Sequence, residues 1–309
     1  MDRLEAMRVF VTVAEMRGFA PAARRLTMSP AAVTRAVSAL EERLGTRLLR
    51  RTTRVVRLTD AGARYLADCK RILGEIEEAE AGATGTEGEP RGMLNVTAPV
   101  NFGRMFVAPI ALGFLAKHPR TSVRMLLVDH VVHLIEEGID VGVRIAHLRD
   151  STLRAVRVGT VRRVVCAAPE YLAKRGTPRT PADLIQHDTI GFLNIHPTRH
   201  WTFASGSKTE TAEPETRLFV NTADVAIAAA KAGHGLTRAF SYQVEPDVRA
   251  GHLRVVLEDF EPAEVPIHIV YPDARRATSS VRAFVDHAVE RLRTVAQSGA
   301  FGTKFTKTR

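Results

Sequence analysis

The hydrophobic pattern of residues 1–26 predicts two short helices. In the first, apolar residues recur at intervals of three and four residues, at Leu4, Met7, Phe10, Val11 and Ala14. Gly18 ends this helix, and Pro21 suits the first turn of a second helix that runs to Leu26.

A third helix is predicted from Ser29, whose hydroxyl can cap the chain, with Pro30 at the first helical position. Its apolar stripe consists of Val33, Ala36, Val37, Leu40 and Leu44. Gly45 supplies the stop. Because only residues 27–28 separate the second helix from the third, the pair is typical of a helix-turn-helix.

Residues 50–58 alternate β-branched residues with arginines and predict a two-stranded ribbon, the wing of a winged helix. Thr59 then caps a long helix that is expected to reach about residue 81. A stripe along this helix has the spacing of a short coiled coil, with members Gly62, Leu66, Cys69, Leu73, Ile76 and Glu80. Because this stripe has no other evident cover, we expect dimerisation through Leu66, Cys69, Leu73 and Ile76.

Residues 82–92 are rich in glycine and predict a hinge. Beyond the hinge, strands and helices alternate, which indicates an α/β domain with a largely parallel sheet. Strands are expected at 94–98, 123–128, 140–145, 161–167, 253–257 and 267–271. Helices are expected at 104–117, 131–137, 224–232 and 278–295. Residues 297–309 are polar and basic, and we expect them to be a disordered tail.

The positive charge of the chain is concentrated near its start. The 309 residues suggest two domains and carry a formal net charge of +10. Residues 1–60 contain twelve arginines, no lysine and six acidic residues, whereas residues 61–90 contain three basic and seven acidic ones. A basic block followed by an acidic one suggests a module that binds a polyanion, next to a segment that does not.

Composition also predicts where the protein resides. No run of about 18 apolar residues occurs, so no membrane span is expected. The first ten residues carry charges, where a signal peptide would be apolar. Cys69 and Cys166 lie far apart, which argues against a disulfide framework or a metal cluster. A cytoplasmic location follows as the expectation.

The stretch from Phe10 to Gly62 resembles the LysR-type transcriptional regulators. The matching residues are Phe19, Ala22-Ala23-Arg24-Arg25-Leu26, Ser29-Pro30, Val33-Thr34-Arg35, Leu40-Glu41-Glu42-Arg43-Leu44-Gly45, Leu48, Leu49, Arg51-Thr52-Thr53-Arg54 and Leu58-Thr59-Asp60-Ala61-Gly62. Sparser matches continue through Ala98-Pro99, Pro109, His118-Pro119, Gly138-Ile139-Asp140-Val141, Cys166-Ala167-Ala168-Pro169, Tyr171-Leu172, Ala232-Gly233, Gly235 and Gly251-His252-Leu253. The resemblance therefore covers roughly residues 2–296.

This resemblance implies an N-terminal all-α winged helix-turn-helix (1–58) with a long linker and dimerisation helix (59–81) and a hinge at 82–92. It also implies a C-terminal α/β periplasmic-binding-protein-like domain of two lobes (93–296). Lobe I is expected at about 93–165 and 266–296, and lobe II at about 166–265.

In function, the resemblance implies a DNA-binding regulator modulated by a small molecule. The implied partners are double-stranded promoter DNA, the small effector, a second copy in a homodimer or dimer of dimers, and RNA polymerase. One departure concerns the loop after Gly235, where family members often carry a proline and this chain has Leu236 and Thr237. The ligand of relatives therefore does not transfer.

For DNA binding we expect the polar face of the third helix and the wing to make the contacts. The candidates are Ser29, Pro30, Ala31, Thr34, Arg35, Ser38, Arg51 and Arg54. Arg35 can read a guanine, and small neighbours permit close approach in the major groove. Arg51 and Arg54 are expected on phosphates or in the minor groove, and the alternation leaves open which wing arginines face the DNA.

For the effector, loops at the carboxyl ends of parallel strands are the expected site. The candidates are Pro99, Asn101, Phe102, Arg144, Thr222 and Phe240. Donors near helix N-termini favour an anionic or polar ligand. The alternatives are that Asn101 and Thr222 are ordinary helix caps, Arg144 forms a structural salt bridge and Phe240 belongs to the core.

No pattern for catalysis or metal binding accompanies these candidates. The histidines lack the spacing of metal ligands, and the two cysteines fit small apolar positions better than a redox switch. We expect no cofactor, no metal and no enzymatic activity. Two rivals remain at this point: a C-terminal enzyme carried to DNA, and a ligand-free architectural or oligomerisation module.

Overall fold

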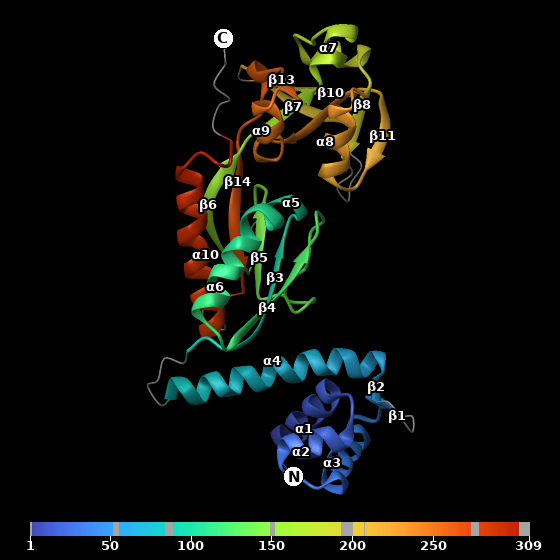
Figure 1. Ribbon diagram of the computed structural model, residues 1–309, viewed down its shortest axis with the longest axis vertical. Helices are drawn as coiled ribbons and strands as arrows, with labels where there is room; N and C mark the ends of the chain where they lie inside the picture. The colour runs from blue at the N-terminus through green and yellow to red at the C-terminus, as the bar shows by residue number, and fades with distance from the viewer. Residues whose placement is uncertain are drawn as a thin grey trace. The chain divides into compact units, whose positions relative to one another are not determined.

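The computed structural model divides the chain into two units, Met1–Glu89 and Pro90–Arg309. It describes residues 2–51, 56–83, 89–148, 152–192, 200–206, 208–272 and 278–302 (Figure 1). The first unit holds the helix-turn-helix and the long helix after it, and the second holds two sheets with their helices.

Three helices form the first unit, as predicted: α1 (Arg3–Met16), α2 (Phe19–Leu26) and α3 (Pro30–Leu44). The Ser29 hydroxyl caps α3 by accepting a hydrogen bond from the Ala32 N–H at 3.1 Å. Gly45 ends α3 in the left-handed conformation, with φ of 64°. Local capping chemistry therefore sets both ends of α3.

The wing is also present, as strands β1 (Leu49–Arg51) and β2 (Val56–Leu58) paired antiparallel. Glu41 of α3 anchors it, because the buried carboxylate accepts hydrogen bonds from the N–H groups of Leu48 and Leu49 at 2.8 and 3.0 Å. Arg54 lies outside the described residues, and Arg51 is described only in its backbone.

The long helix α4 (Asp60–Ala83) differs from expectation in what covers its apolar stripe. Cys69 is fully buried and Leu73 nearly so, both within the core that α1, α2 and α3 form. Leu66 packs against the same core. The expectation that this stripe has no cover within its own chain is wrong. Helix α4 folds back onto α1, and the core of the first unit covers the stripe at Cys69 and Leu73. Ile76 is half-buried.

The first sheet of the second unit forms lobe I and has the strand order β4-β3-β5-β14-β6. Its strands are β3 (Gly92–Ala98), β4 (Thr121–Leu127), β5 (Val141–Ile145), β6 (Arg154–Val161) and β14 (Val265–Tyr271). β3 pairs parallel with β4 and β5, but β14 pairs antiparallel with β5 and β6, so the sheet is mixed and the prediction of a largely parallel sheet is wrong. Helices α6 (Ala108–Lys117) and α10 (Ser279–Gln297) lie beside each other and bury its core (Figure 1).

A short helical run leads into α6. It consists of α5 (Val100–Phe102) and a π-helical turn (Gly103–Val107). By length and composition the stretch Val100–Lys117 is the one described candidate for a membrane span. Its large side chains, such as Phe102 and Phe114, are fully buried in the lobe I core, which accounts for its apolar character.

The second sheet forms lobe II and has the order β11-β8-β12-β7-β13. Its strands are β7 (Arg163–Ala167), β8 (Thr189–Phe192), β11 (Thr216–Val220), β12 (Leu236–Phe240) and β13 (Arg254–Val256). A hairpin of β9 (Trp201–Ser205) and β10 (Lys208–Ala212) accompanies it. The helical elements are α7 (Pro169–Arg175), α8 (Ala223–Lys231), α9 (Ser241–Arg249) and two 3₁₀ turns, Pro181–Gln186 and Glu258–Phe260.

The chain crosses between the lobes at Arg162 and returns at Glu261. The first crossing lies earlier than the expected boundary after residue 165, so Arg163 already belongs to lobe II. The two crossings are joined, because one Arg162 guanidinium nitrogen contacts both carboxylate oxygens of Glu261 at 2.9 Å. Both side chains are mostly buried, so this ion pair joins the two segments that connect lobe I with lobe II.

Two further expected features of the second unit are wrong. The predicted helix at 131–137 is a turn, because Val132 and Leu134 both pack into a small cluster beside β14. The segment 297–302 is ordered rather than disordered, since Phe301 is buried against Phe102 and Phe106 with ring centroids 5.4 and 5.1 Å apart. Residues 303–309 lie outside the described residues.

Candidate functional site

The solvent-facing surface of α3 carries most of the predicted DNA contacts. Ser29, Pro30, Ala31 and Arg35 are exposed, while Thr34 and Ser38 are half-buried. The Thr34 hydroxyl donates to the Pro30 carbonyl of its own helix at 2.9 Å. Arg35 is therefore a long, exposed cation near the start of this surface, opposite the buried Val33, Ala36 and Val37.

In the wing, register places Arg50 of β1 directly opposite Arg57 of β2. Both side chains are exposed, and directly opposed residues of a ladder point to the same face. Two exposed arginines on one face of the wing form a surface suited to phosphate contacts. The alternation alone left open whether this pair or Arg51 and Arg54 faces the DNA.

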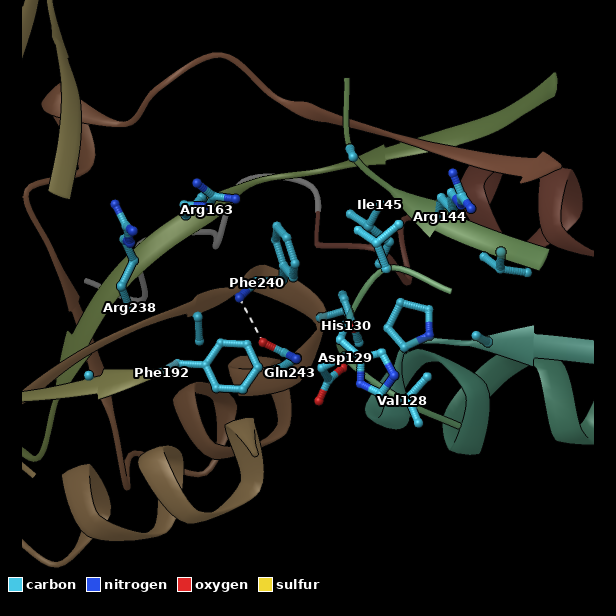
Figure 2. A pocket seen from close by; sticks show the side chains of 18 of the residues that line it. Val128, Asp129, His130, Arg144, Ile145, Arg163, Phe192, Arg238, Phe240 and Gln243 are labelled. Atoms are coloured by element: carbon cyan, nitrogen blue, oxygen red, sulfur yellow. Dashed lines mark hydrogen bonds between the residues drawn. The ribbon is translucent and has the colours of Figure 1, made fainter. Parts of the chain in front are cut away.

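A cleft with a volume of about 350 Å³ lies in the second unit and takes its walls from both lobes. Lobe I supplies residues at the ends of β3 and β5 and just after β3, β4 and β5, and lobe II supplies the faces of β7, β8 and β12 (Figure 2). Its described lining includes Thr97, Pro99, Val128, Asp129, His130, Arg144, Ile145, Arg163, Phe192, Trp201, Arg238, Phe240 and Gln243. The mixture of aromatic walls and a few charged groups is typical of a small-molecule site.

Two arginines of lobe II define one end of the cleft. The guanidinium of Arg163 lies 5.4 Å from the ring centre of Phe240, and that of Arg238 lies 5.4 Å from the ring centre of Trp201. Burial lowers the pKa of Arg163, and burial together with the charge of Arg163 lowers the pKa of Arg238 to about 10. Among the described residues neither arginine has a carboxylate partner.

Lobe I supplies the other end of the cleft (Figure 2). One carboxylate oxygen of Asp129 accepts a hydrogen bond from the Val100 N–H at 3.0 Å, and the other has no partner among the described groups. Burial raises the pKa of Asp129 despite that bond. Arg144 donates to the Val132 carbonyl at 2.7 Å, and burial lowers its pKa.

Two family models match the chain in sequence. The model for the bacterial regulatory helix-turn-helix protein of the lysR family matches residues 4–63, and the model for the LysR substrate binding domain matches residues 87–293. The chain belongs to the LysR family of transcriptional regulators. It is thus a regulator with a helix-turn-helix and an effector-binding domain, and its described architecture agrees with that organisation.

Named relatives of this LysR-type regulator extend over almost its whole length. An HTH-type transcriptional repressor of Pseudomonas aeruginosa is 35% identical over 94% of this chain and 92% of its own. The structure of CrgA, a LysR-type transcriptional regulator from Neisseria meningitidis, is similar with a TM-score of 0.60, 31% identity, and coverage of 93% of this chain and 98% of that one. The full-length structure of the Vibrio cholerae virulence activator AphB has a TM-score of 0.58, 25% identity and coverage of 94% and 99%.

Only some predicted effector residues line the cleft of this LysR-type regulator. Pro99, Arg144 and Phe240 do. Asn101 and Thr222 do not, and the side-chain amide oxygen (Oδ1) of the buried Asn101 instead accepts a hydrogen bond from the Arg104 guanidinium at 2.9 Å. Thr222 stands at the N-terminal end of α8 without a capping bond from its side chain.

Phe102 is also absent from the lining, because it is fully buried in the lobe I core. The salt bridge considered as the alternative role of Arg144 is absent among the described residues, since its described partner is the Val132 carbonyl. Position along the chain predicted the segments after β3 and at the end of β5 correctly, but the one before α8 does not reach the cleft, and side-chain direction selected which residues of the first two line it.

The arginines of lobe II were not among the predicted effector residues. The sequence does carry a signal for Arg238, which interrupts the mostly apolar strand β12, Leu-Thr before it and Ala-Phe after it, whereas Arg163 stands at the start of the apolar strand β7, before Val-Val-Cys-Ala. A charged residue inside such a strand is usual only where the strand faces water or a ligand. In the described part of this regulator, no group of three or more His, Cys, Asp or Glu residues is placed to hold a metal.

Proposed function

We propose that this LysR-type regulator binds promoter DNA through α3 and the wing, and changes its output when a small anionic molecule occupies the cleft between its lobes. The observation that carries the proposal is the cleft itself, whose 350 Å³ suit a small metabolite. Three arginines and one carboxylate line it among the described residues, so its charge favours an anion.

On the DNA side, Arg35 is proposed to read a base edge, with Ser29, Pro30, Ala31, Thr34 and Ser38 forming the close-packed surface around it. The exposure of Arg35 on α3 supports this assignment. Arg51 and Arg54 remain proposed phosphate contacts, and the exposed pair Arg50 and Arg57 joins them.

The deciding experiment is footprinting of the full-length protein on DNA upstream of its own gene and its neighbours, followed by addition of candidate acids. We expect one protected region at low nanomolar to micromolar protein, with a pattern or affinity that changes with an acid. Equal affinity for all DNA sequences would refute the proposal that the protein binds specific promoters. Specific protection that no small molecule alters would refute the proposal that an effector changes DNA binding.

Dimerisation through α4 is also proposed, now centred on Ile76, since Cys69 and Leu73 are covered by their own chain. The half-buried Ile76 lies beyond that covered stretch. Ile76→Asp is expected to raise the dimer dissociation constant at least tenfold in analytical ultracentrifugation, because it would bury a charge at the seam. Arg64→Asp, at an exposed position of the same helix, is the control. An unchanged dimer in Ile76→Asp would contradict the assignment.

A cytoplasmic location and contact with RNA polymerase complete the proposal. Both follow from the role of a promoter-bound regulator, since promoter DNA and the polymerase share that compartment. Co-purification of polymerase with the regulator on a promoter fragment, compared with the fragment alone, tests the second point. No enrichment of polymerase under either condition, with or without an acid, would contradict it.

A further inference from the structure

Arg163 and Arg238 occupy one face of the lobe II sheet. β12 pairs antiparallel with β7, and Phe240 lies directly opposite Arg163 while Arg238 lies opposite Val165. Residues directly opposed and residues two apart share a face, so both arginines and Phe240 point the same way and the two guanidinium groups are diagonal neighbours. All three line the cleft (Figure 2).

This arrangement places two partly buried positive charges beside each other. Neither guanidinium has a hydrogen bond or ion pair within the described part of the chain, and each instead packs over an aromatic ring. An aromatic face attracts a cation but does not satisfy the N–H donors of a guanidinium. Partly buried like charges without an opposite charge are unfavourable, so the pair is poised for an anion.

The cleft offers no internal counterion that could serve both arginines. Its one described carboxylate, Asp129, stands at the lobe I end and has one oxygen engaged by Val100. A ligand with a single negative charge would offset one guanidinium and leave the other unbalanced. A group with two negative charges offsets both and offers enough oxygens for two forked donors.

We propose that the arginine pair Arg163 and Arg238 is a subsite for a dianionic group, a dicarboxylate or a phosphate monoester, with its carbon body against Phe240, Phe192 and Trp201. This inference rests on the proposed effector cleft and specifies its ligand class. The aromatic walls accept an apolar or ring-bearing body, and the rigid strands hold the guanidinium groups in place before the ligand arrives.

The protein carries its own reporter for this test, because Trp201 is the only tryptophan of the chain and lines the cleft. Its fluorescence is titrated with two matched pairs of acids at constant pH and ionic strength. Phthalate against benzoate varies the second carboxylate, and phenyl phosphate against benzenesulfonate varies the charge of one head group. Comparison of the two dianions distinguishes the dicarboxylate from the phosphate source.

We expect at least one dianion to bind at least tenfold more tightly than its monoanionic partner. Arg163→Met and Arg238→Met, which keep side-chain length and remove charge, should each reduce that affinity at least tenfold and reduce the preference for the dianion. Arg254→Met is the matched control, since Arg254 is exposed on the neighbouring strand β13. Circular dichroism of each variant establishes that it is folded.

Equal affinities within both pairs, or unchanged binding in both methionine variants, would overturn the dianion subsite. Those results leave the proposed function standing if a neutral or monoanionic compound still alters the footprint on DNA. A different result would refute the proposed function: phthalate or phenyl phosphate binds in the cleft, but no compound changes the footprint on DNA.

Discussion

The two units of this regulator use arginine in opposite settings. Arg35, Arg50 and Arg57 stand exposed on the first unit, whereas Arg163 and Arg238 lie half-buried in the cleft of the second. Both sets suit anions, but of different size. DNA is too large to be enclosed, so its phosphates must be met by cations that reach outward. A small acid can be enclosed, so its cations can lie inside the cleft, where solvent screens them less.

The contrast also concerns what holds the cations in place. The exposed arginines of the first unit stand on a helix and a wing that Glu41 ties together through two backbone hydrogen bonds. The cleft arginines stand on central strands of a sheet, and aromatic rings support their guanidinium groups. The first arrangement leaves long side chains free to adapt to DNA, and the second fixes them for a ligand of defined shape.

Salt dependence offers the largest separation between the two arginine sets. Raising salt from 50 to 200 mM should weaken binding to DNA by roughly 10³–10⁵-fold if six to ten phosphates are contacted. Binding of an acid in the cleft should weaken far less, because enclosed charges are less screened. Fluorescence anisotropy of labelled DNA and titration of Trp201 fluorescence measure the two slopes. Parallel slopes would remove the distinction between exposed and enclosed cations.

The next largest effect tests whether the C-terminal segment belongs to the effector unit. Phe301→Ala should destabilise that unit by about 3–5 kcal/mol, because it empties a buried aromatic position against Phe102 and Phe106. Calorimetry should show the loss in the transition of the second unit only. Leu112→Ala, at a position 68% exposed, is the control. A shift as small as that of Leu112→Ala would mean that the segment is dispensable.

The corresponding test of the first unit concerns its buried carboxylate. Glu41→Ala leaves the Leu48 and Leu49 N–H groups unpaired, at a cost of about 1–3 kcal/mol for each. The transition of the first unit should therefore move to lower temperature while that of the second unit stays. Glu42→Ala changes the exposed neighbour and should have little effect. Equal shifts in both variants would contradict an anchoring role for Glu41.

The smallest effect distinguishes base reading from phosphate contact within the first unit. Arg35→Ala should cost about 1–3 kcal/mol at one base position and leave the preference elsewhere intact. Arg57→Ala should weaken all sequences similarly and reduce the salt slope by about one. Selection of DNA sequences with each variant provides the comparison. An unchanged base preference of the Arg35→Ala variant would mean that another residue of α3 reads the DNA.

Much of the first unit was predictable because its signals are local. The sequence predicted the start of α3 from Ser29 and Pro30 and its end from Gly45, and the helix in the structure begins and ends there. The wing followed from alternation over a few residues. The cover of Cys69 and Leu73 was not predictable in this way, because it depends on α4 folding back onto α1. A periodic stripe shows that a face is buried without showing what buries it.

In the second unit, the order of elements along the chain predicted an α/β domain and the strand-end loops that supply Pro99 and Arg144 to the cleft. The tertiary structure decided which side chains meet there. The register of β12 on β7 brings Arg238 beside Arg163, although the two are far apart in sequence. The packing of the folded chain also buries Phe301 against Phe102 and Phe106, although it belongs to a polar C-terminal segment of the sequence. Helix caps and turns depend on neighbouring residues, whereas a binding cleft depends on strand pairing and side-chain direction, which only the folded chain specifies.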